Sequence, residues 1–585
     1  MATTASGSSG YVCCRFFLQV ITGRCFMMFA SFLIMACAGA TYLFGVYSKD
    51  IKSTLGYDQS TLNLMSTFKD LGANVGILSG LLAEVAPTWF VLLVGALMNF
   101  TGYFMIWLAV TKRVATPKVW QMCAYICIGA NSQNFANTGS LVTCVKNFPQ
   151  SRGMMLGLMK GFVGLSGAIF PQIYYAIYGN DSKSLILLIG WFPAAISLVF
   201  VYNIRAMKIS THPNETKVLH EYLGIATVLA LLIMALTIAQ KRVPFSHTAY
   251  LFSGVAVCFI MFSPFLIAIR EEFYTWRNRE QLTAPIRLVD EAPTLPETEM
   301  KSEIEYESME TKEASASGCS SIFKPPKRGE DFSILQALFS IDMFLVFLGT
   351  FCGLGCSLTA VDNLGQIGES LGYPYQAVST VVSLLSIWNY FGRVFAGFVS
   401  EIILLKYKIP RPLIMSLVFL LAAVGDLLIA FPWPGSVYLA SLLLGFSFGA
   451  QQTLLFTIVS ELFGLKYYAT LFNCAQLSSP LGSFVLNVRI VGKLYDKEAW
   501  KQLAAKGMAR SMVKELTCIG EQCYRLSFSI LAATNTFGSV VILVLVLRTR
   551  KYYGGDIYKR FRDEIAENEK EMALKSAQEM QMVES

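Results

Sequence analysis

Long apolar runs follow one another along almost the whole chain of 585 residues. A bilayer core about 30 Å thick needs roughly 20 apolar helical residues to cross it. Windows of that length predict an all-α polytopic membrane protein with 14 spans. The predicted ranges are 26–47, 59–84, 87–110, 117–144, 152–178, 182–205, 218–239, 246–269, 338–360, 375–400, 412–431, 435–460, 467–490 and 525–547.

Polar segments divide these spans into domains. Residues 270–335 carry 14 acidic and 9 basic side chains together with several prolines, a composition typical of a disordered linker. We expect an N-terminal segment, a six-helix bundle, two inserted helices, this acidic linker, a second six-helix bundle and a charged tail. Their predicted ranges are 1–25, 26–205, 206–269, 270–335, 336–547 and 548–585.

The short loops carry an uneven basic charge. With the N-terminus inside, the inner short segments hold 16 Lys and Arg residues and the outer ones hold 8. Cytoplasmic loops of membrane proteins are enriched in Lys and Arg. We therefore expect a multi-pass protein with both termini in the cytoplasm.

Composition excludes several other classes of protein. The chain is 54% hydrophobic and only 15% charged, against about 25% charge in a soluble protein. A net charge of +8 forms no stripe for nucleic acid, and only 3 His are present. A phosphate-binding loop and a nucleophile–base pattern are also missing. We expect no enzyme activity, no cofactor, no metal site and no nucleic-acid partner.

The first and last six spans repeat one another. Leu55-Gly56-Tyr57 recurs as Leu371-Gly372-Tyr373, Ala83-Glu84 as Ser400-Glu401, and Gly129 as Gly445, with offsets of 316 or 317 residues. Two parallel repeats with a binding site between them near the membrane midplane are a transporter architecture.

Segments 43–48, 55–59 and 72–76 carry a resemblance to a known family. Together with the two six-helix units, they resemble the plant nodulin-like branch of the major facilitator superfamily, which includes proteins similar to nuclear fusion defective 4. The resemblance implies a major-facilitator-like fold, two six-helix bundles with two extra central helices. It also implies a monomeric secondary transporter in a lipid bilayer that works by alternating access.

The superfamily's loop signature between the second and third spans places a conformational gate. Its first copy keeps Gly80 and Glu84 but lacks the basic residues, whereas the second copy keeps Arg393 and Glu401. The resemblance therefore implies gate roles for Glu84, Arg393 and Glu401. The incomplete first copy and the long linker also motivate the alternative of a non-transporting receptor or scaffold on the same fold.

Two spans combine small residues with a lysine. Small residues spaced four apart let helix backbones approach closely in lipid, and a lysine within a span costs at least about 2.5–3.5 kcal/mol unless it faces protein or water. We predict that Lys69 and Lys160 contact a small organic anion. The alternatives are an ion pair with an acid of a neighbouring helix, or snorkelling. The predicted packing glycines are Gly72, Gly76, Gly80, Gly157 and Gly164.

Other polar side chains inside the spans are candidates for solute contact. Asp70 shares a polar stripe on its span and either carries a coupling proton or pairs with a basic residue. Side-chain amides either orient a polar solute or join helices. The amides assigned to the substrate are Asn131, Asn134, Gln451, Gln452, Asn473 and Gln476, the last being the repeat partner of Lys160.

The loop 491–524 lies outside in this topology and contains Cys518 and Cys523. An oxidising compartment favours disulfides, so the two residues are predicted to form one.

Overall fold

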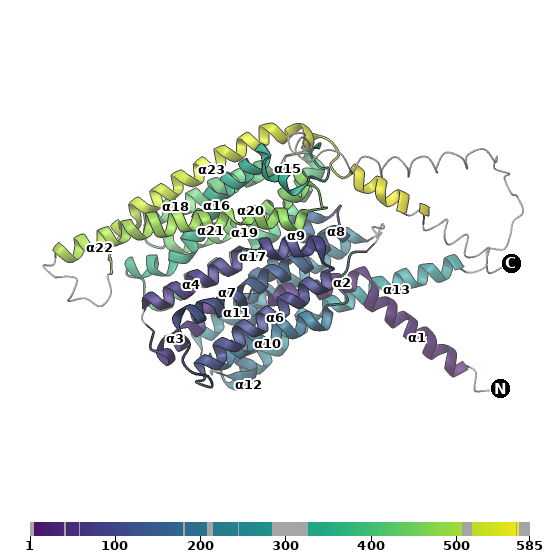
Figure 1. Ribbon diagram of the computed structural model, residues 1–585, viewed down its shortest axis with the longest axis horizontal. Helices are drawn as coiled ribbons and strands as arrows, with labels where there is room; N and C mark the ends of the chain where they lie inside the picture. The colour runs from purple at the N-terminus through teal and green to yellow at the C-terminus, as the bar shows by residue number, and fades with distance from the viewer. Residues whose placement is uncertain are drawn as a thin grey trace, which may run out of the picture.

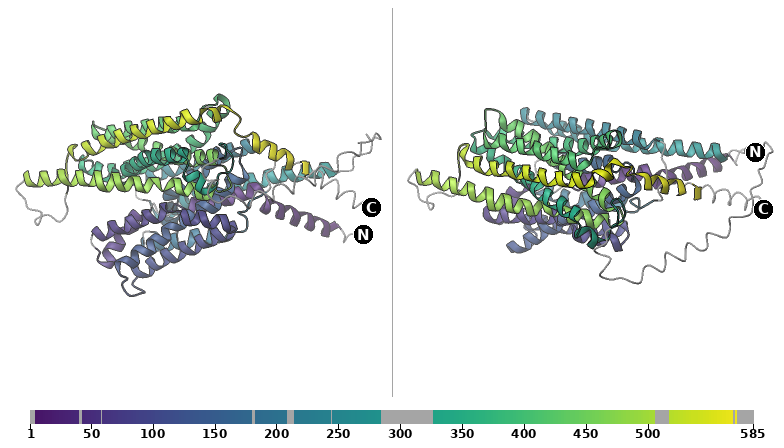
Figure 2. Two further views of the ribbon diagram at one scale, coloured as in Figure 1. Left: turned by 45° about the horizontal axis from the view of Figure 1, so that its top comes forward. Right: turned by 90° about the horizontal axis from the view of Figure 1, so that it is seen from above.

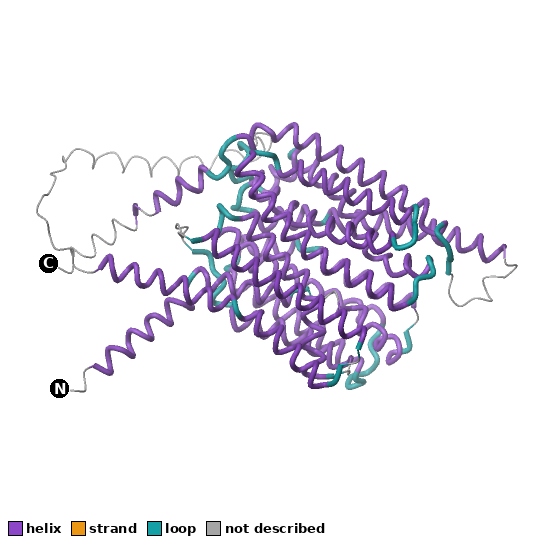
Figure 3. The backbone as a smooth tube through the Cα atoms, turned by 180° about the vertical axis from the view of Figure 1, so that it is seen from behind, coloured by secondary structure: helices purple, strands orange, loops and turns teal. Residues whose placement is uncertain are grey.

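A computed structural model describes residues 5–39, 43–57, 59–179, 182–207, 214–243, 245–283, 326–505, 517–568 and 570–571. This part of the chain consists of helices and loops without a strand (Figure 3). The helices before residue 284 are α1 (Ala5–Thr22), α2 (Arg24–Cys37), α3 (Phe44–Leu55), α4 (Gln59–Asn74), α5 (Ile77–Val85), α6 (Thr88–Val110), α7 (Val119–Ala136), η2 (Asn137–Leu141), α8 (Val142–Asn147), α9 (Arg152–Tyr178), α10 (Ser182–Phe200), α11 (Glu215–Arg242), α12 (His247–Phe262) and α13 (Pro264–Thr283). The later ones are α15 (Ile334–Leu338), α16 (Ile341–Ser370), α17 (Tyr375–Tyr407), α18 (Arg411–Ala430), α19 (Ser436–Phe463), α20 (Tyr468–Gln476), α21 (Ser478–Ser483), η3 (Phe484–Gly492), α22 (Lys493–Ala505) and α23 (Gln522–Gly554).

The helices are long and apolar because a chain in lipid must satisfy its backbone polar groups internally. Nine helices of the described residues are long and apolar enough to cross a membrane, or up to ten with the bent pair of α1 and α2. They identify an integral, multi-pass membrane protein. Other predicted spans fall on interrupted helices, such as α4 and α5 within 59–84, so length and apolarity alone do not yield the predicted count of 14.

The chain folds into two bundles that lie side by side (Figures 1 and 2). We call residues 24–207 the N-terminal half, residues 326–554 the C-terminal half, and the surface between them the seam. The end of the bundle where α1 and α13 project is the linker end (Figure 1). The opposite end, at α3 and α22, is the far end.

The helices differ in how central they are. In α9, 83% of the apolar window is buried inside the protein, and in α19 78%. In the inserted helix α11 the share is only 28%, so this helix is less enclosed by the rest of the protein. The seam is therefore built by helices such as α9 and α19, and α11 covers it from outside.

Glycines allow the two halves to touch at the backbone. A Cβ atom on Gly157 of α9 would lie 2.9 Å from the Cα atom of Gly397 on α17. A Cβ atom on Gly80 of α5 would lie 2.8 Å from the Cα atom of Thr470 on α20. Gly72 and Gly76 are equally crowded, whereas Gly164 has ordinary contacts. Four of the five predicted packing glycines thus lie where a side chain has no room.

The polar segments contain more structure than their composition predicts. Residues 284–325, most of the predicted linker, lie outside the described residues, but α13 continues to Thr283. Within the predicted charged tail, Tyr558 and Phe561 are buried. At the far end, Cys518 and Cys523 are joined by a disulfide.

Replacing Gly157 by Ala tests the crossing of α9 and α17. The new Cβ meets backbone atoms that cannot rotate away, and overpacking of this kind costs about 1–3 kcal/mol. We expect a lower melting temperature of the purified protein in detergent. Gly224→Ala on α11 is the matched control, because nothing lies within 4 Å of its Cβ position. Equal melting temperatures for the two variants would contradict the close crossing.

Candidate functional site

A buried ion cluster closes the linker end of the C-terminal half. The Arg411 guanidinium pairs with Glu401 through Nη2 and Oε2 at 2.6 Å, and with Glu461 through Nε and Oε1 at 2.7 Å. The side chains are at most 1% exposed. A buried charge is tolerated when it is paired and hydrogen-bonded, and here two carboxylates surround one guanidinium.

The N-terminal half attaches to this cluster at the start of α9. The Gly153 N–H donates to Oε2 of Glu401 at 3.1 Å. Arg152 donates from Nη1 to the Ser460 carbonyl oxygen at 3.1 Å. These hydrogen bonds cross the seam, so Glu401, one of the predicted gate residues, lies where the two halves meet.

The C-terminal tail completes the cluster. The Tyr558 hydroxyl donates to Oε1 of Glu401 at 2.7 Å, and the Tyr553 hydroxyl donates to Oε2 of Glu461 at 2.8 Å. The Arg152 guanidinium lies 5.2 Å from the centroid of the Tyr558 ring. Every carboxylate oxygen of the cluster therefore has a donor.

Sequence reasoning missed most of this cluster. Arg152 and Arg411 count in the sequence among the basic residues of the inner short segments, Arg411 also follows the second copy of the loop motif, and Tyr558 falls in the predicted charged tail. The sequence does contain one sign of the cluster: Glu401 and Glu461 are acids that follow two predicted spans, 375–400 and 435–460, which end on the same side of the membrane.

Glu84, the repeat counterpart of Glu401 in the N-terminal half, makes a weaker contact across the seam than Glu401 does. Glu84 on α5 accepts one hydrogen bond from the Thr470 hydroxyl on α20, at 3.3 Å. Beside it, Lys146 donates to the Lys466 carbonyl oxygen at 3.5 Å. The first copy of the loop motif lacks the basic residues of the second copy. Among the described residues, its contact with the other half accordingly contains no buried ion pair.

Lys160 lies at the seam, eight residues along α9 from Arg152, or about 12 Å deeper at 1.5 Å per residue. Its side chain is 3% exposed. The Nζ atom donates to Oδ1 of Asn137 at 3.4 Å and lies 4.2 Å from the centroid of the Phe456 ring. Its contacts are therefore an amide oxygen and an aromatic face rather than a carboxylate.

Arg393 lies directly against Lys160 across the seam. It is 1% exposed. Nη1 donates to the Lys160 carbonyl oxygen at 2.8 Å, and Nε donates to Oδ1 of Asn389 at 2.6 Å. Within the part of the chain that the structure describes, no carboxylate oxygen lies within 4.0 Å of either cation. Lys160 and Arg393 thus form a pair of buried basic side chains that interact electrostatically with one another.

A π-helical turn shapes the seam beside Lys160. The segment η2 carries both Asn137 and Thr138. Thr138 accepts a hydrogen bond from Nδ2 of Asn473 at 3.2 Å and is 2.9 Å from the Ser79 hydroxyl. Single π-helical turns are frequent at functional sites. Asn473, a predicted substrate residue, here joins the halves.

The other predicted amides have different surroundings. Asn131 and Asn134 donate to the Gly72 carbonyl oxygen, each at 2.9 Å, and Asn131 also donates to that of Val75. They satisfy carbonyls next to the break between α4 and α5. Gln451 and Ser357 bond one another at 3.1 Å. Gln476 is buried, with Oε1 lacking a partner among the described residues, and Gln452 is half-buried.

Lys69 and Asp70 form a second polar group nearer the far end. Lys69 Nζ pairs with Oδ1 of Asp70 at 2.9 Å and lies 5.5 Å from the centroid of the Phe44 ring. Asp362 on α16, which the sequence reasoning did not select, interacts electrostatically with both. Asn487 donates to its Oδ2 at 3.4 Å. Lys69 thus has an acid partner that Lys160 lacks.

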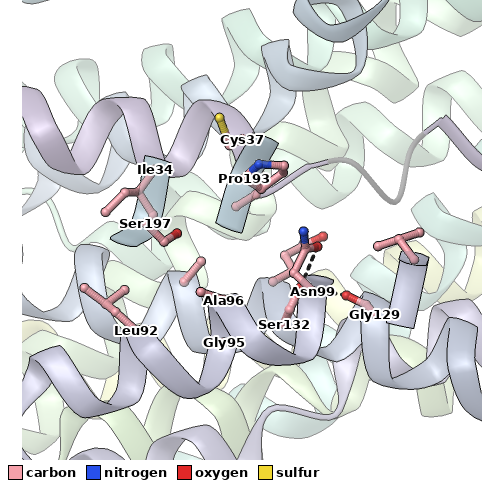
Figure 4. Close-up of a pocket in the computed structure, with 14 residues that line it drawn as sticks. Ile34, Cys37, Leu92, Gly95, Ala96, Asn99, Gly129, Ser132, Pro193 and Ser197 are labelled. Atoms are coloured by element: carbon pink, nitrogen blue, oxygen red, sulfur yellow. Dashed lines mark hydrogen bonds between the residues drawn. The ribbon is translucent and has the colours of Figure 1, made fainter. Parts of the chain in front are cut away.

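Two of the cavities in the described part of the chain differ in size and position. A cavity of about 30 Å³ inside the N-terminal half is bordered by Asn99 and Ser132, whose side chains bond one another (Figure 4). Its volume equals about one water molecule. A larger cavity of about 450 Å³ lies at the seam and includes Asn389, the partner of Arg393. Only the second falls within the roughly 300–1,000 Å³ of small-molecule sites.

Replacing Glu401 by Gln tests whether the cluster holds the linker end closed. The change leaves the Arg411 charge partly uncompensated, and breaking a buried pair costs about 3–5 kcal/mol. We expect backbone hydrogen exchange in residues 152–160 and 397–411 to accelerate at least about tenfold. Glu498→Gln, in an exposed pair with Lys501, is the control and is expected to change nothing. Unchanged exchange in both variants would show that the cluster does not hold the seam.

Comparison with known proteins identifies the family. Residues 24–269 match the family model described as Nodulin-like, and residues 329–555 match the model NFD4, C-terminal domain. Protein NUCLEAR FUSION DEFECTIVE 4 of Arabidopsis thaliana is 26% identical over 539 residues, covering 90% of this chain and 89% of that protein. A protein named "Probable transporter MCH1" from Yarrowia lipolytica is 24% identical over 231 residues, covering 37% of this chain and 44% of its own length.

Solved structures show the same fold. A structure of XylE, described as a proton:xylose symporter of the major facilitator superfamily, has a TM-score of 0.52 at 12% identity and covers 89% of this chain and 96% of XylE. A double-tryptophan variant of XylE gives a TM-score of 0.53 at 12% identity, covering 89% and 95%. The chain therefore belongs to the nodulin-like, NFD4-related family and has the fold of the major facilitator superfamily structure of XylE.

Proposed function

We propose that the protein is a secondary active transporter that moves an organic anion by alternating access at the seam. One observation carries the proposal: Lys160 and Arg393 are buried side by side without a carboxylate partner among the described residues. An isolated buried charge is costly unless it is paired. A bound anion would remove that cost.

The residue types suit a carboxylate ligand. The planar Arg guanidinium matches carboxylate geometry, whereas the Lys ammonium acts as a compact point charge. The side chain of Lys160 is held by Asn137 and Phe456, contacts that an anion can join or replace. The resulting site would bind the charged group of the solute at the level where the two halves touch.

The linker-end cluster supports a rocking motion of the halves. Arg411, Glu401 and Glu461 all belong to the C-terminal half, so opening the seam leaves their ion pairs intact. The seam bonds described above at Gly153 and Arg152 would break. Hydrogen bonds to charged groups contribute about 1.5–3 kcal/mol each, an amount that ligand binding can supply.

The relatives and the cavity favour transport over the alternative of a receptor or scaffold. A related protein carries the name of a transporter, and the structures with the same fold include a symporter. The cavity of about 450 Å³ at the seam gives a solute room. We further propose that the linker end faces the cytoplasm, following the bias of basic residues in the short loops.

Replacing Lys160 by Gln tests the anion site. Losing one partner of a buried charge contact costs about 2–5 kcal/mol. We therefore expect KM for a carboxylate taken up by proteoliposomes to rise at least about 30-fold, with partial rescue by Lys160→Arg. Lys501→Gln, at an exposed lysine of α22 that pairs with Glu498, is the control and is expected to change KM less than about threefold. Carboxylate uptake that survives Lys160→Gln and Arg393→Gln unchanged would refute the anion site.

We propose Asp70 and Asp362 as the carboxylates that couple transport to protons. Asp362 is exposed, the Asp70 side chain is 45% exposed, and the two carboxylates interact across the seam. Asp70 already pairs with Lys69, whereas Asp362 accepts a hydrogen bond from the Asn487 amide, so Asp362 is the stronger candidate for the proton carrier. Exposure toward the far end would let it exchange protons with that side of the membrane.

Asp362→Asn tests this coupling. We expect the variant to lose uptake driven by an imposed pH gradient but to keep exchange of labelled for unlabelled solute, because exchange needs no net proton movement. Asp496→Asn, an exposed acid on α22, should retain both activities. Gradient-driven uptake that persists in the Asp70→Asn, Asp362→Asn double variant would rule these carboxylates out.

A further inference from the structure

The larger seam cavity is walled by the inserted helices as well as by the two halves. Its lining residues come from α9 in the N-terminal half, from α16, α17 and α19 in the C-terminal half, and from α11 and α12. From the inserted helices they include Ala230, Ile233, Thr237, Gln240 and Tyr250. These helices lie outside the two six-helix units, so the cavity is not completed by those units alone.

One wall of the cavity reaches the buried cations. Asn389 lines it and accepts the hydrogen bond from Nε of Arg393 at 2.6 Å. Gly164 also lines it, and a Cβ atom there would lie 3.6 Å from the same Nε. Asn389 therefore connects the wall of the cavity directly to Arg393.

The walls suit an uncharged, apolar group. No residue among those that line the cavity carries a charge at neutral pH. Such a surface offers no cationic partner to a second anionic group, and burial of an unpaired charge there would be costly. The apolar lining residues include Leu165, Ile233, Val361, Leu385, Ile387 and Phe448.

Paired amides close the cavity on the side of α11 and α12. Gln172 on α9 and Gln240 on α11 donate to one another, at 3.2 and 2.7 Å. Ser253 on α12 donates to Oε1 of Gln172 at 3.4 Å. The Tyr175 and Tyr250 rings pack with their centroids 4.9 Å apart. These bonds hold the inserted helices against α9.

The inserted helix α11 also touches the C-terminal half. The Thr227 hydroxyl lies 3.5 Å from the Tyr390 hydroxyl on α17. Because α11 contacts both halves, it covers the seam from outside instead of simply adding lipid-facing surface.

We infer that α11 and α12 complete a pocket for the apolar body of the transported anion. The solute would be an amphipathic organic acid whose carboxylate meets Lys160 and Arg393 and whose uncharged body lies in this cavity. The inference rests on the proposed anion transport and narrows its substrate class. It assigns Ile233 and Thr237 of α11 as residues that determine specificity.

A homologous series of carboxylates tests the pocket. Acetate, butyrate, hexanoate and the dianion succinate would be tested for equilibrium binding to the full chain in nanodiscs, with protein-free nanodiscs as the blank. Each buried methylene is expected to tighten binding about fourfold. Hexanoate should therefore bind far more tightly than acetate, and succinate should bind more weakly than hexanoate.

Two substitutions test whether the effect of chain length on binding arises in the cavity. Thr237→Phe fills it, so hexanoate should bind at least about tenfold more weakly while acetate changes less than about twofold. Ile238→Phe, on the exposed face of the same helix, is the matched control. Ile233→Ala should weaken hexanoate at least about threefold, which keeps the test valid if Thr237→Phe does not fold. Melting curves would establish folding for all three variants.

The outcomes separate this inference from the proposed function. Affinity that stays flat along the series, or succinate binding tightest, with Lys160→Gln still abolishing binding, would overturn the pocket and leave the anion site intact. Absence of binding for every carboxylate would overturn both. A chain-length gradient that Thr237→Phe removes and Ile238→Phe preserves would support the pocket.

Discussion

The arrangement at the seam follows from the cost of burying charge in a protein that lies in lipid. Two groups of buried basic side chains in this fold have different surroundings. At the linker end, Arg411 is surrounded by two carboxylates of its own half. About two helical turns deeper, Lys160 and Arg393 are just as buried but have no carboxylate partner among the described residues. The first arrangement is complete in itself, and the second is the one that the proposed anion would complete.

The ion cluster, the packing glycines and α11 each lie at a defined place relative to the seam. The ion pairs of the linker-end cluster stay within the C-terminal half, and hydrogen bonds at the start of α9 join it to the other half. In the proposed rocking motion, opening would break a few hydrogen bonds and leave the buried charges of this cluster compensated. Backbone contact at Gly157 and Gly80 lets the halves fit closely when shut. Inserted helix α11 contacts both halves, so it can follow their motion.

The sequence predicts the features that depend on residue type and spacing. Apolar runs, the repeat and the glycine faces predict the helices and the two halves, and the depth of Lys160 marks it as unusual. Partners depend on tertiary contacts that no spacing reveals. Arg411 and Tyr558 look like solvated loop and tail residues until the fold buries them. Asn131 looks like a solute ligand but satisfies carbonyls at the break between α4 and α5, and neither that break nor the π-helical turn η2 has a simple sequence signature.

Cryo-electron microscopy of the full chain in lipid nanodiscs, with and without a saturating organic carboxylate, tests the central claim most directly. The account predicts ligand density within hydrogen-bond distance of both the Lys160 ammonium and the Arg393 guanidinium, present only in the sample with the carboxylate. Density elsewhere, or a carboxylate of the chain itself bound to these two cations in both samples, would contradict it.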